Sequence, residues 1–214
     1  MVDKKFDIEN VDSRLSAVYT SDQDKEAAYD QWANSYETDL VNDLGYVAHI
    51  DAASIFSKVF GDTGASVLDV ACGTGLVGEE LKNLGYTNVD GTDFSQEMLK
   101  VSDDRKVYQR LFQHDFTASA VEQGIYDALI CVGMFAFSLP KICHMIHVIN
   151  MVSPGGLCVI TVNGAAWTEK NLDVQVKEES RRHGFCVEQI IEAGYIRRES
   201  IDSRVLVIRR SVTG

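Results

Sequence analysis

A glycine-rich loop with an aspartate just before it is the first part of the chain that could do chemistry. The stretch DVACGTGLVGEE runs from Asp69 to Glu80 and contains G-T-G-L-V-G, a G-x-G-x-x-G pattern. Glycines suit a nucleotide-binding loop because they let the backbone approach a ligand closely and adopt positive φ. Asp93 follows Gly73 at the distance where an acidic residue can accept hydrogen bonds from ribose hydroxyls. The pattern predicts a nucleotide-containing ligand without identifying it.

Three features favour a positively charged nucleotide over a dinucleotide. Asp69 would repel a diphosphate seated on the following helix N-terminus, whereas it would attract a cationic amino acid group. No tyrosine is followed four residues later by a lysine, so the Tyr-x-x-x-Lys pair common in small dehydrogenases is missing. The loop also begins far from the N-terminus, unlike the loop of most single-domain dehydrogenases.

Strands and helices alternate along the chain from about residue 65, and this alternation must position the loop. Apolar, β-branched runs predict strands over 66–71, 88–94, 107–115, 126–133 and 157–164. Helical patterns lie between them over 76–85, 95–104, 117–124 and 139–152, with Ser95 as an N-cap and Gly85 as a C-cap. A helix over 168–184 is followed by a strand pair over 185–200 and 203–211 that suits an antiparallel hairpin. The order predicts an open α/β sheet with mostly parallel strands.

The segment before the sheet has a different character. Amphipathic helices rich in aromatic residues are expected over 24–40 and 46–61. Tyr29, Trp32 and Tyr36 are spaced i, i+3 and i+7, which places them on one helical face. The chain shows no repeat and no linker, so we expect residues 1–214 to form one domain, with a helical lid over 1–60 and a sheet core over 65–214.

Two motifs carry a family resemblance. VLDVACGTG followed by GTDFSQEMLK resembles class I S-adenosylmethionine-dependent methyltransferases, whose usual forms are LDVGCGTG and D-x-S-x-x-M-L. The similarity runs from about Ser66 to Thr161, and YDQWANSYETDL resembles the lid helix of the same family. The resemblance implies a Rossmann-like fold, with a mostly parallel seven-stranded sheet, an antiparallel final strand and helices on both faces. It also implies S-adenosylmethionine as methyl donor and S-adenosylhomocysteine as product.

The resemblance assigns parts of the donor to particular residues. Asp69 and the loop backbone would hold the methionine part, with Cys131 at its border; the loop residues are Ala71, Cys72, Gly73 and Gly75. Ala71 stands where the family has glycine, and a positive φ there would cost about 1 kcal/mol.

The resemblance also places the nucleoside and the lid. Asp93 would bind the ribose, and Phe94 and Met98 would pack on the adenine. Asp115 would accept from the adenine amino group beside the Phe116 backbone. The lid aromatics Tyr29, Trp32 and Tyr36 would reach the donor carboxylate or the acceptor, and Asn163 and Trp167 would line an acceptor pocket.

Charge and cysteine usage exclude several classes of protein. A net charge of −12 and a pI near 4.8 disfavour nucleic acid as a partner, because such binding depends on neutralising phosphates. The five cysteines form no C-x-x-C pair, which favours a reducing compartment and argues against zinc. The N-terminus lacks a signal-peptide pattern, and the longest apolar run, 128–139, is too short to span a membrane. We therefore expect a cytoplasmic monomer or weak dimer without a metal ion.

Methyl transfer needs alignment more than a particular catalytic side chain, so no catalytic residue follows from the sequence. Candidate bases, should the acceptor have to lose a proton, are Tyr36, His49, His114 and His147. Spacing also allows His144 and His147 to share a metal ion, but no carboxylate lies on the same turn. Three alternatives stay open: a catalytically silent donor-binding protein, an NAD-dependent oxidoreductase and an interaction domain that binds no donor. The acceptor is expected to be a small molecule or a protein side chain.

Overall fold

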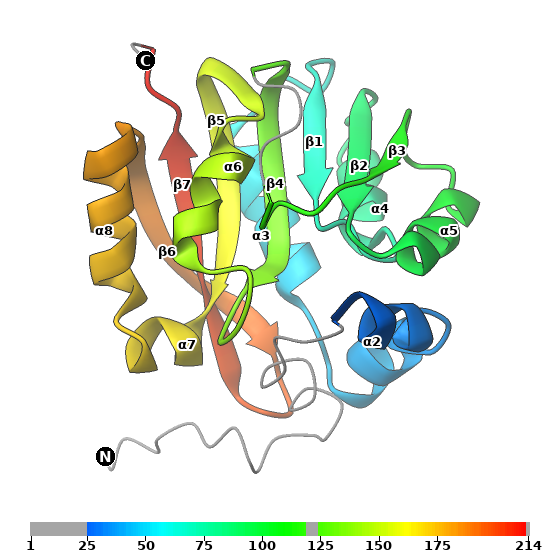
Figure 1. Ribbon diagram of the computed structural model, residues 1–214. Coiled ribbons are helices and arrows are strands. Elements are labelled where there is room, and N and C mark those ends of the chain that lie inside the picture. Colours follow the sequence, from blue (N-terminus) through cyan, green and yellow to red (C-terminus); the bar gives the residue numbers. More distant parts are fainter. Residues whose placement is uncertain (1–24, 119–123, 213–214) are drawn as a thin grey trace.

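A seven-stranded sheet forms the centre of the computed structural model, which describes residues 25–118 and 124–212 (Figure 1). Its strand order is β3-β2-β1-β4-β5-β7-β6. β7 runs antiparallel to both of its neighbours, whereas the other pairs are parallel. The strands are β1 (Val67–Val70), β2 (Val89–Asp93), β3 (Leu111–Gln113), β4 (Tyr126–Phe135), β5 (Val152–Asn163), β6 (Cys186–Ile196) and β7 (Ile201–Arg209). This confirms the mostly parallel Rossmann-like sheet and the C-terminal antiparallel hairpin.

Helices cover both faces of the sheet. One apolar core includes side chains of α3 and α4, and a second core on the other face includes side chains of α6 and α8. The helices of the sheet region are α3 (Ala48–Val59), α4 (Leu76–Asn83), α5 (Gln96–Asp104), α6 (Met145–Ile149), α7 (Gly164–Glu169) and α8 (Leu172–His183), with a 3₁₀ turn η2 (Ile142–His144). Side chains alternate between the two cores along β1, where Val67 joins the first and Leu68 and Val70 join the second. Both faces of β1 are buried, which explains why its residues are mostly apolar.

The predicted helix signals near the glycine loop are confirmed. The Ser95 hydroxyl accepts a hydrogen bond from the Met98 amide at 3.1 Å and so caps α5. Gly85 ends the α4 region with φ +93°, a conformation that favours glycine.

Several predicted boundaries are wrong for identifiable reasons. The predicted third strand over 107–115 is a strand only over Leu111–Gln113, and Tyr108 before it donates from its hydroxyl to Asp69. The predicted helix over 139–152 begins only at Ile142, after Pro140, and its first turn is 3₁₀. β5 runs through the predicted turn at 153–156, where Gly155 has φ +83°. Most of the predicted helix over 117–124 lies outside the described residues.

The predicted helix over 24–40 is divided in two. α2 (Lys25–Trp32) ends before a π-helix, η1 (Thr38–Asp43). The Asp39 carboxylate accepts from the Trp32 indole at 2.7 Å and from the Ser35 hydroxyl at 3.0 Å, so side-chain hydrogen bonds hold the chain in the intervening turn. Figure 1 shows α2 beyond the carboxyl ends of β1 and β2. Residues 1–24 of the expected lid lie outside the described part of the chain.

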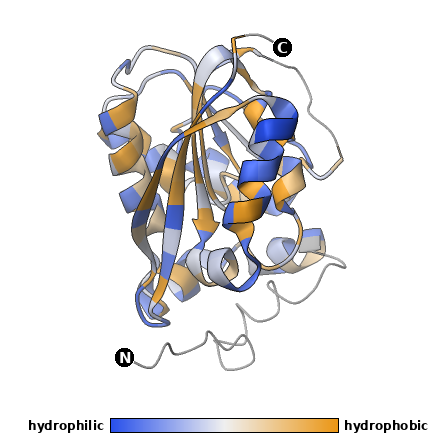
Figure 2. Ribbon diagram, turned by 90° about the vertical axis from the view of Figure 1, so that its left-hand side faces the viewer, coloured by the Kyte–Doolittle hydropathy of each residue, from blue (hydrophilic) through white to orange (hydrophobic). Residues whose placement is uncertain are grey.

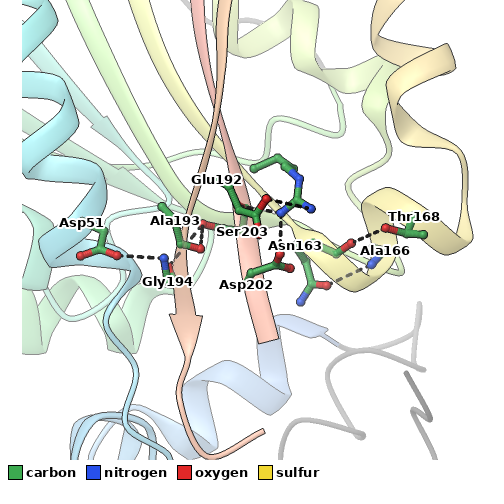
Figure 3. Close-up of polar contacts among 11 residues, drawn as sticks. Asp51, Asn163, Ala166, Thr168, Glu192, Ala193, Gly194, Asp202 and Ser203 are labelled. Atoms are coloured by element: carbon green, nitrogen blue, oxygen red, sulfur yellow. Dashed lines mark hydrogen bonds and ion pairs between the residues drawn. The ribbon is translucent and has the colours of Figure 1, made fainter. Parts of the chain in front are cut away.

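The far edge of the sheet is fastened to α3. Figure 2 shows β6, the edge strand, with hydrophilic and hydrophobic residues mixed along its length, as suits a strand with an exposed face. The Gly194 amide of β6 donates to the Asp51 carboxylate of α3 at 2.8 Å (Figure 3). An added Cβ at Gly194 would lie 2.8 Å from the Val47 side chain, so the close approach requires glycine. Within residues 25–118 and 124–212, none of the helices is long and apolar enough to cross a membrane.

Candidate functional site

A cavity of about 600 Å³ opens at the carboxyl ends of β1, β2 and β4, beneath α2. This is the edge at which open α/β sheets bind ligands, and the volume suits a drug-sized ligand. Most residues that the sequence assigned to the donor line it: Tyr29, Trp32, Tyr36, Ala71, Gly73, Asp93, Phe94, Met98, Asp115 and Phe116. Asp69, Cys72, Gly75 and Cys131 do not belong to its lining.

The glycine loop turns its open side toward this cavity. Ala71 and Gly73 adopt φ +57° and +53°, so the cost considered for a positive φ at Ala71 applies. An added Cβ at Gly73 would meet no atom within 4 Å, whereas one at Gly75 would lie 2.8 Å from the Arg105 side chain. The first glycine therefore gives a ligand access to the loop, and the second lets Arg105 pack behind it.

Asp93 joins the loop to the end of β2. Its Oδ2 accepts from the Gly73 amide and its Oδ1 from the Ser95 amide, both at 2.9 Å. Burial raises the pKa of Asp93 to about 6, although these amides act in the opposite direction. A carboxylate offers about four acceptor positions, so two further donors such as ribose hydroxyls find acceptors here.

Asp69 lies behind the loop, on the face of β1 toward α4. The side chain is fully buried, and the Tyr108 hydroxyl donates to Oδ2 at 2.6 Å. Oδ1 is buried without a hydrogen-bond partner. Burial raises the pKa of Asp69 to about 7. The third glycine of the motif, Gly78, makes this contact possible, because a Cβ there would collide with the Tyr108 ring.

Polar contacts of Asp30 and Glu37 fasten the lid to the site. The Asp30 carboxylate of α2 accepts from the Ser95 hydroxyl at 2.5 Å. Arg105, directly after α5, donates from Nε to the Thr74 carbonyl of the loop at 2.6 Å and from Nη2 to Glu37 at 2.5 Å. Its Nη1 donates to Glu79 of α4. Arg105 thus connects the lid, the glycine loop and α4 through one guanidinium group.

Aromatic rings form the remaining wall. The Tyr29 ring meets Phe94 edge-on at 5.4 Å, and Trp32 meets Tyr36 edge-on at 4.8 Å. The predicted aromatic face therefore reaches the cavity even though α2 ends at Trp32. Tyr46 and Tyr195, which the sequence did not single out, also line the cavity.

The histidines proposed as bases or metal ligands have structural contacts. His144 Nδ1 accepts from the Lys141 amide at 2.9 Å, and His147 Nδ1 lies 2.7 Å from the Phe116 carbonyl. Burial lowers the pKa of His49 to about 4, and His49 is not part of the cavity lining. His114 does line the cavity. In the described part of the chain no group of His, Cys, Asp and Glu side chains is arranged to hold a metal ion.

Two predicted acceptor residues lie elsewhere. Asn163 is fully buried at the end of β5, where its Oδ1 accepts from the Ala166 amide at 3.1 Å and caps α7 (Figure 3). Trp167 packs against the core on the α6 and α8 face. The prediction that these two residues line the pocket is therefore wrong for this cavity, because the Asn163 side chain caps α7 and Trp167 packs against the core.

Comparison with known proteins agrees with the geometry. Residues 67–156 match the model of a family described as a methyltransferase domain, and this segment holds the glycine loop, Asp93 and β4. This match agrees with the resemblance to S-adenosylmethionine-dependent methyltransferases that the sequence predicted.

The curated relatives that the chain resembles are named as methyltransferases. The chain is 33% identical over 136 residues to human methyltransferase-like protein 27, covering 62% of this chain and 55% of the relative. It is 31% identical over 134 residues to ubiquinone biosynthesis O-methyltransferase of Klebsiella pneumoniae strain 342, covering 58% and 51%. The chain thus spans about half the length of the curated relatives it matches.

A solved structure shows the same fold. The TehB-like SAM-dependent methyltransferase from Corynebacterium glutamicum aligns with a TM-score of 0.60 at 18% identity, covering 84% of this chain and 97% of that one.

Proposed function

We propose that the protein transfers a methyl group from S-adenosylmethionine to a small molecule or a protein side chain. The observation that carries the proposal is the open glycine loop beside a buried carboxylate: Gly73 faces the cavity, and Asp93 accepts from its amide at 2.9 Å. Asp93 would bind the ribose, and Phe94, Met98, Asp115 and Phe116 would surround the adenine. The Ala71 to Gly75 backbone would hold the methionine part.

Asp69 would act on the donor from behind the loop. Its unpaired, buried Oδ1 and its raised pKa indicate an ionised form that lacks compensation in the protein alone. The positive charge of an amino acid ammonium group on the cavity side of the loop would compensate it; a diphosphate would not. This favours S-adenosylmethionine over NAD.

The reaction requires alignment and exclusion of water. S-adenosylmethionine supplies a methyl carbon already activated by a sulfonium group. Holding the acceptor in line with that carbon can lower the barrier by about 7–11 kcal/mol. Tyr29, Trp32 and Tyr36 cover the cavity from the lid side and would keep water out.

Further expectations belong to the same proposal. We infer one domain over residues 1–214, a cytoplasmic location, a monomer or weak dimer and no nucleic acid partner. The acidic charge and the lack of Lys or Arg among the described residues of the cavity support the last point. Within the family, the lid segment and the YVAHIDAASIF segment resemble the methyltransferase-like protein of the Williams–Beuren syndrome chromosomal region.

Calorimetric titration tests the donor. We expect binding of S-adenosylmethionine and S-adenosylhomocysteine and none of NAD. Asp93→Asn should lower donor affinity by about tenfold or more, because an amide replaces one of two acceptor oxygens and faces a backbone N–H. Exposed Asp103→Asn is the matched control. Binding of NAD, or unchanged affinity in Asp93→Asn, would contradict the proposal.

Release of S-adenosylhomocysteine during incubation with metabolite and peptide libraries then separates an enzyme from a catalytically silent binder. A protein that binds both nucleosides without any turnover would favour the silent alternative. Absence of any nucleoside binding would instead favour the interaction domain.

A further inference from the structure

One part of the cavity is lined by aromatic and apolar side chains. We call it the acceptor chamber; it is lined by Tyr36, Leu40, Tyr46, Val132, Tyr195 and Ile196. These side chains come from η1, from the segments flanking it, and from the ends of β4 and β6. The acidic lining residues Glu26, Asp30, Asp93 and Asp115 all belong to α2 or to the ends of β2 and β3. The chamber is therefore an aromatic and apolar space joined to an acidic donor end.

The backbone holds the chamber tyrosines Tyr46 and Tyr195 in place. The Tyr46 amide donates to the Leu40 carbonyl and the Val47 amide donates to the Tyr195 carbonyl, both at 3.0 Å. Tyr46 also forms a β-bridge with Ile196. The two rings meet edge-on at 5.5 Å. This arrangement fixes the rings before a ligand enters, which reduces the entropy lost on binding.

Both tyrosine hydroxyls converge on Gly133 in the last part of β4. An added Cβ at Gly133 would lie 3.4 Å from the Tyr46 hydroxyl oxygen and 3.6 Å from that of Tyr195. Gly133 has φ +84° and lines the cavity. Two phenols and a glycine from separate elements thus define one small region of the chamber wall.

Charge limits what the chamber can hold. The described lining residues of the whole cavity include no Lys and no Arg, and the chain has a net charge of −12. A carboxylate or phosphate acceptor would therefore enter without a compensating cation. Aromatic faces attract cations instead, and the acidic field of the protein favours their approach.

The protonation states of Tyr36 and His49 bear on the chemical class of the acceptor. Burial raises the pKa of Tyr36 well above its ordinary value, so this phenol stays protonated at neutral pH. His49 stacks on the Tyr46 ring at 5.3 Å, and burial lowers its pKa to about 4. Neither group is suited to remove a proton from a hydroxyl acceptor near pH 7, and His114 lies with the acidic lining residues that flank β3. An amine enters as its ammonium form, which the aromatic and acidic surroundings attract, and can lose its proton to water before it reacts.

We propose, resting on the proposed function, that the acceptor is an amine on a small apolar or aromatic molecule, bound between Tyr36, Tyr46 and Tyr195. It approaches as an ammonium ion and loses one proton to water before the nitrogen reacts. The nitrogen lone pair forms the new bond to the methyl carbon. The carbon–sulfur bond breaks with its electron pair moving to sulfur, which yields S-adenosylhomocysteine. Positive charge passes from sulfur to nitrogen, and the N-methylammonium product stays beside the aromatic wall until it leaves.

Matched ligands test the class of acceptor. Phenethylamine, phenethyl alcohol and phenylacetic acid have similar size and differ in the reacting group. Each is titrated into the protein saturated with S-adenosylhomocysteine, and each is assayed with methyl-labelled S-adenosylmethionine. We expect tighter binding and methyl incorporation for the amine alone. If no amine binds more tightly than its matched alcohol and acid, or if the alcohol or acid is the methylated compound, the proposal is overturned.

Ring and hydroxyl variants at Tyr46 test the chamber itself. Tyr46→Phe keeps the aromatic face, whereas Tyr46→Leu removes it. Tyr46→Leu should weaken amine binding by about tenfold and Tyr46→Phe by much less, while donor affinity stays unchanged in both. Equal effects of the two changes would refute the role of the ring. Loss of donor binding by the unmodified protein would instead contradict the proposed function, so the two failures can be told apart.

Discussion

Replacement of Asp69 by asparagine should change how the stability of the protein depends on pH. Burial raises the pKa of Asp69 from 3.8 to about 7. At about 1.4 kcal/mol per pKa unit, ionisation of this carboxyl above pH 7 costs the folded protein at most about 4 kcal/mol. The asparagine side chain cannot ionise, and its amide oxygen can still accept from the Tyr108 hydroxyl.

The direction follows from proton binding. The folded protein keeps the Asp69 proton up to about pH 7, whereas the unfolded chain releases it near pH 4. The unfolded chain thus binds fewer protons between these values, and the free energy of unfolding falls as pH rises through this window. Asp93, with a pKa of about 6, contributes a similar fall that remains in the variant.

Urea unfolding at pH 4.5 and pH 8 measures the effect. Relative to the unmodified protein, Asp69→Asn should gain about 2–4 kcal/mol in free energy of unfolding between the two pH values. The comparison removes any pH-independent cost of the buried amide. Asp103→Asn, at an exposed site, should run parallel to the unmodified protein. Parallel curves for Asp69→Asn as well would refute the assignment of a raised pKa.

Three further substitutions test the loop, the lid and the β6 contact. Arg105→Gln removes the ion pairs to Glu37 and Glu79, and we expect donor affinity to fall by about tenfold in calorimetry; unchanged affinity would mean that the lid is held otherwise. Ala71→Gly relieves a positive φ and should raise the free energy of unfolding by up to about 1 kcal/mol, whereas a loss beyond the error of urea unfolding would contradict the strain. Gly194→Ala places a Cβ 2.8 Å from Val47 and should cost about 1–3 kcal/mol; a neutral result would show that α3 can shift.

Local sequence patterns predicted the part of the cavity formed by the glycine loop, Asp93 and Ser95. These residues follow one another closely in the chain. The loop sits between β1 and α4, Ser95 caps α5, and Asp93 ends β2, so strand, turn and cap signals locate all three. The family resemblance drew attention to Ala71 as the position where glycine is usual, and the structure shows that it adopts φ +57°.

Contacts between distant segments could not be predicted in this way. Tyr108 reaches Asp69 across 39 positions, and Arg105 reaches Glu37 across 68. Tyr46 and Tyr195 meet only because the end of β6 lies against the segment before α3. No periodicity connects such pairs. The one indirect signal is the third glycine of the motif, since Gly78 leaves room for a large ring that the motif itself does not name.

The buried carboxylates of the site connect the stability of the folded protein with the binding of a cationic ligand. Asp69 and Asp93 are both buried with raised pKa values, so their ionised forms destabilise the protein when the cavity holds no cation. In the proposed function a cationic donor would compensate them and lower both pKa values, so its binding at pH 7 should release protons. The acceptor chamber holds no described charged lining residue and leaves the carboxylates to the donor. This separation predicts that affinity for S-adenosylmethionine rises with pH between about 5 and 8, and that the Asp69→Asn protein loses much of this rise.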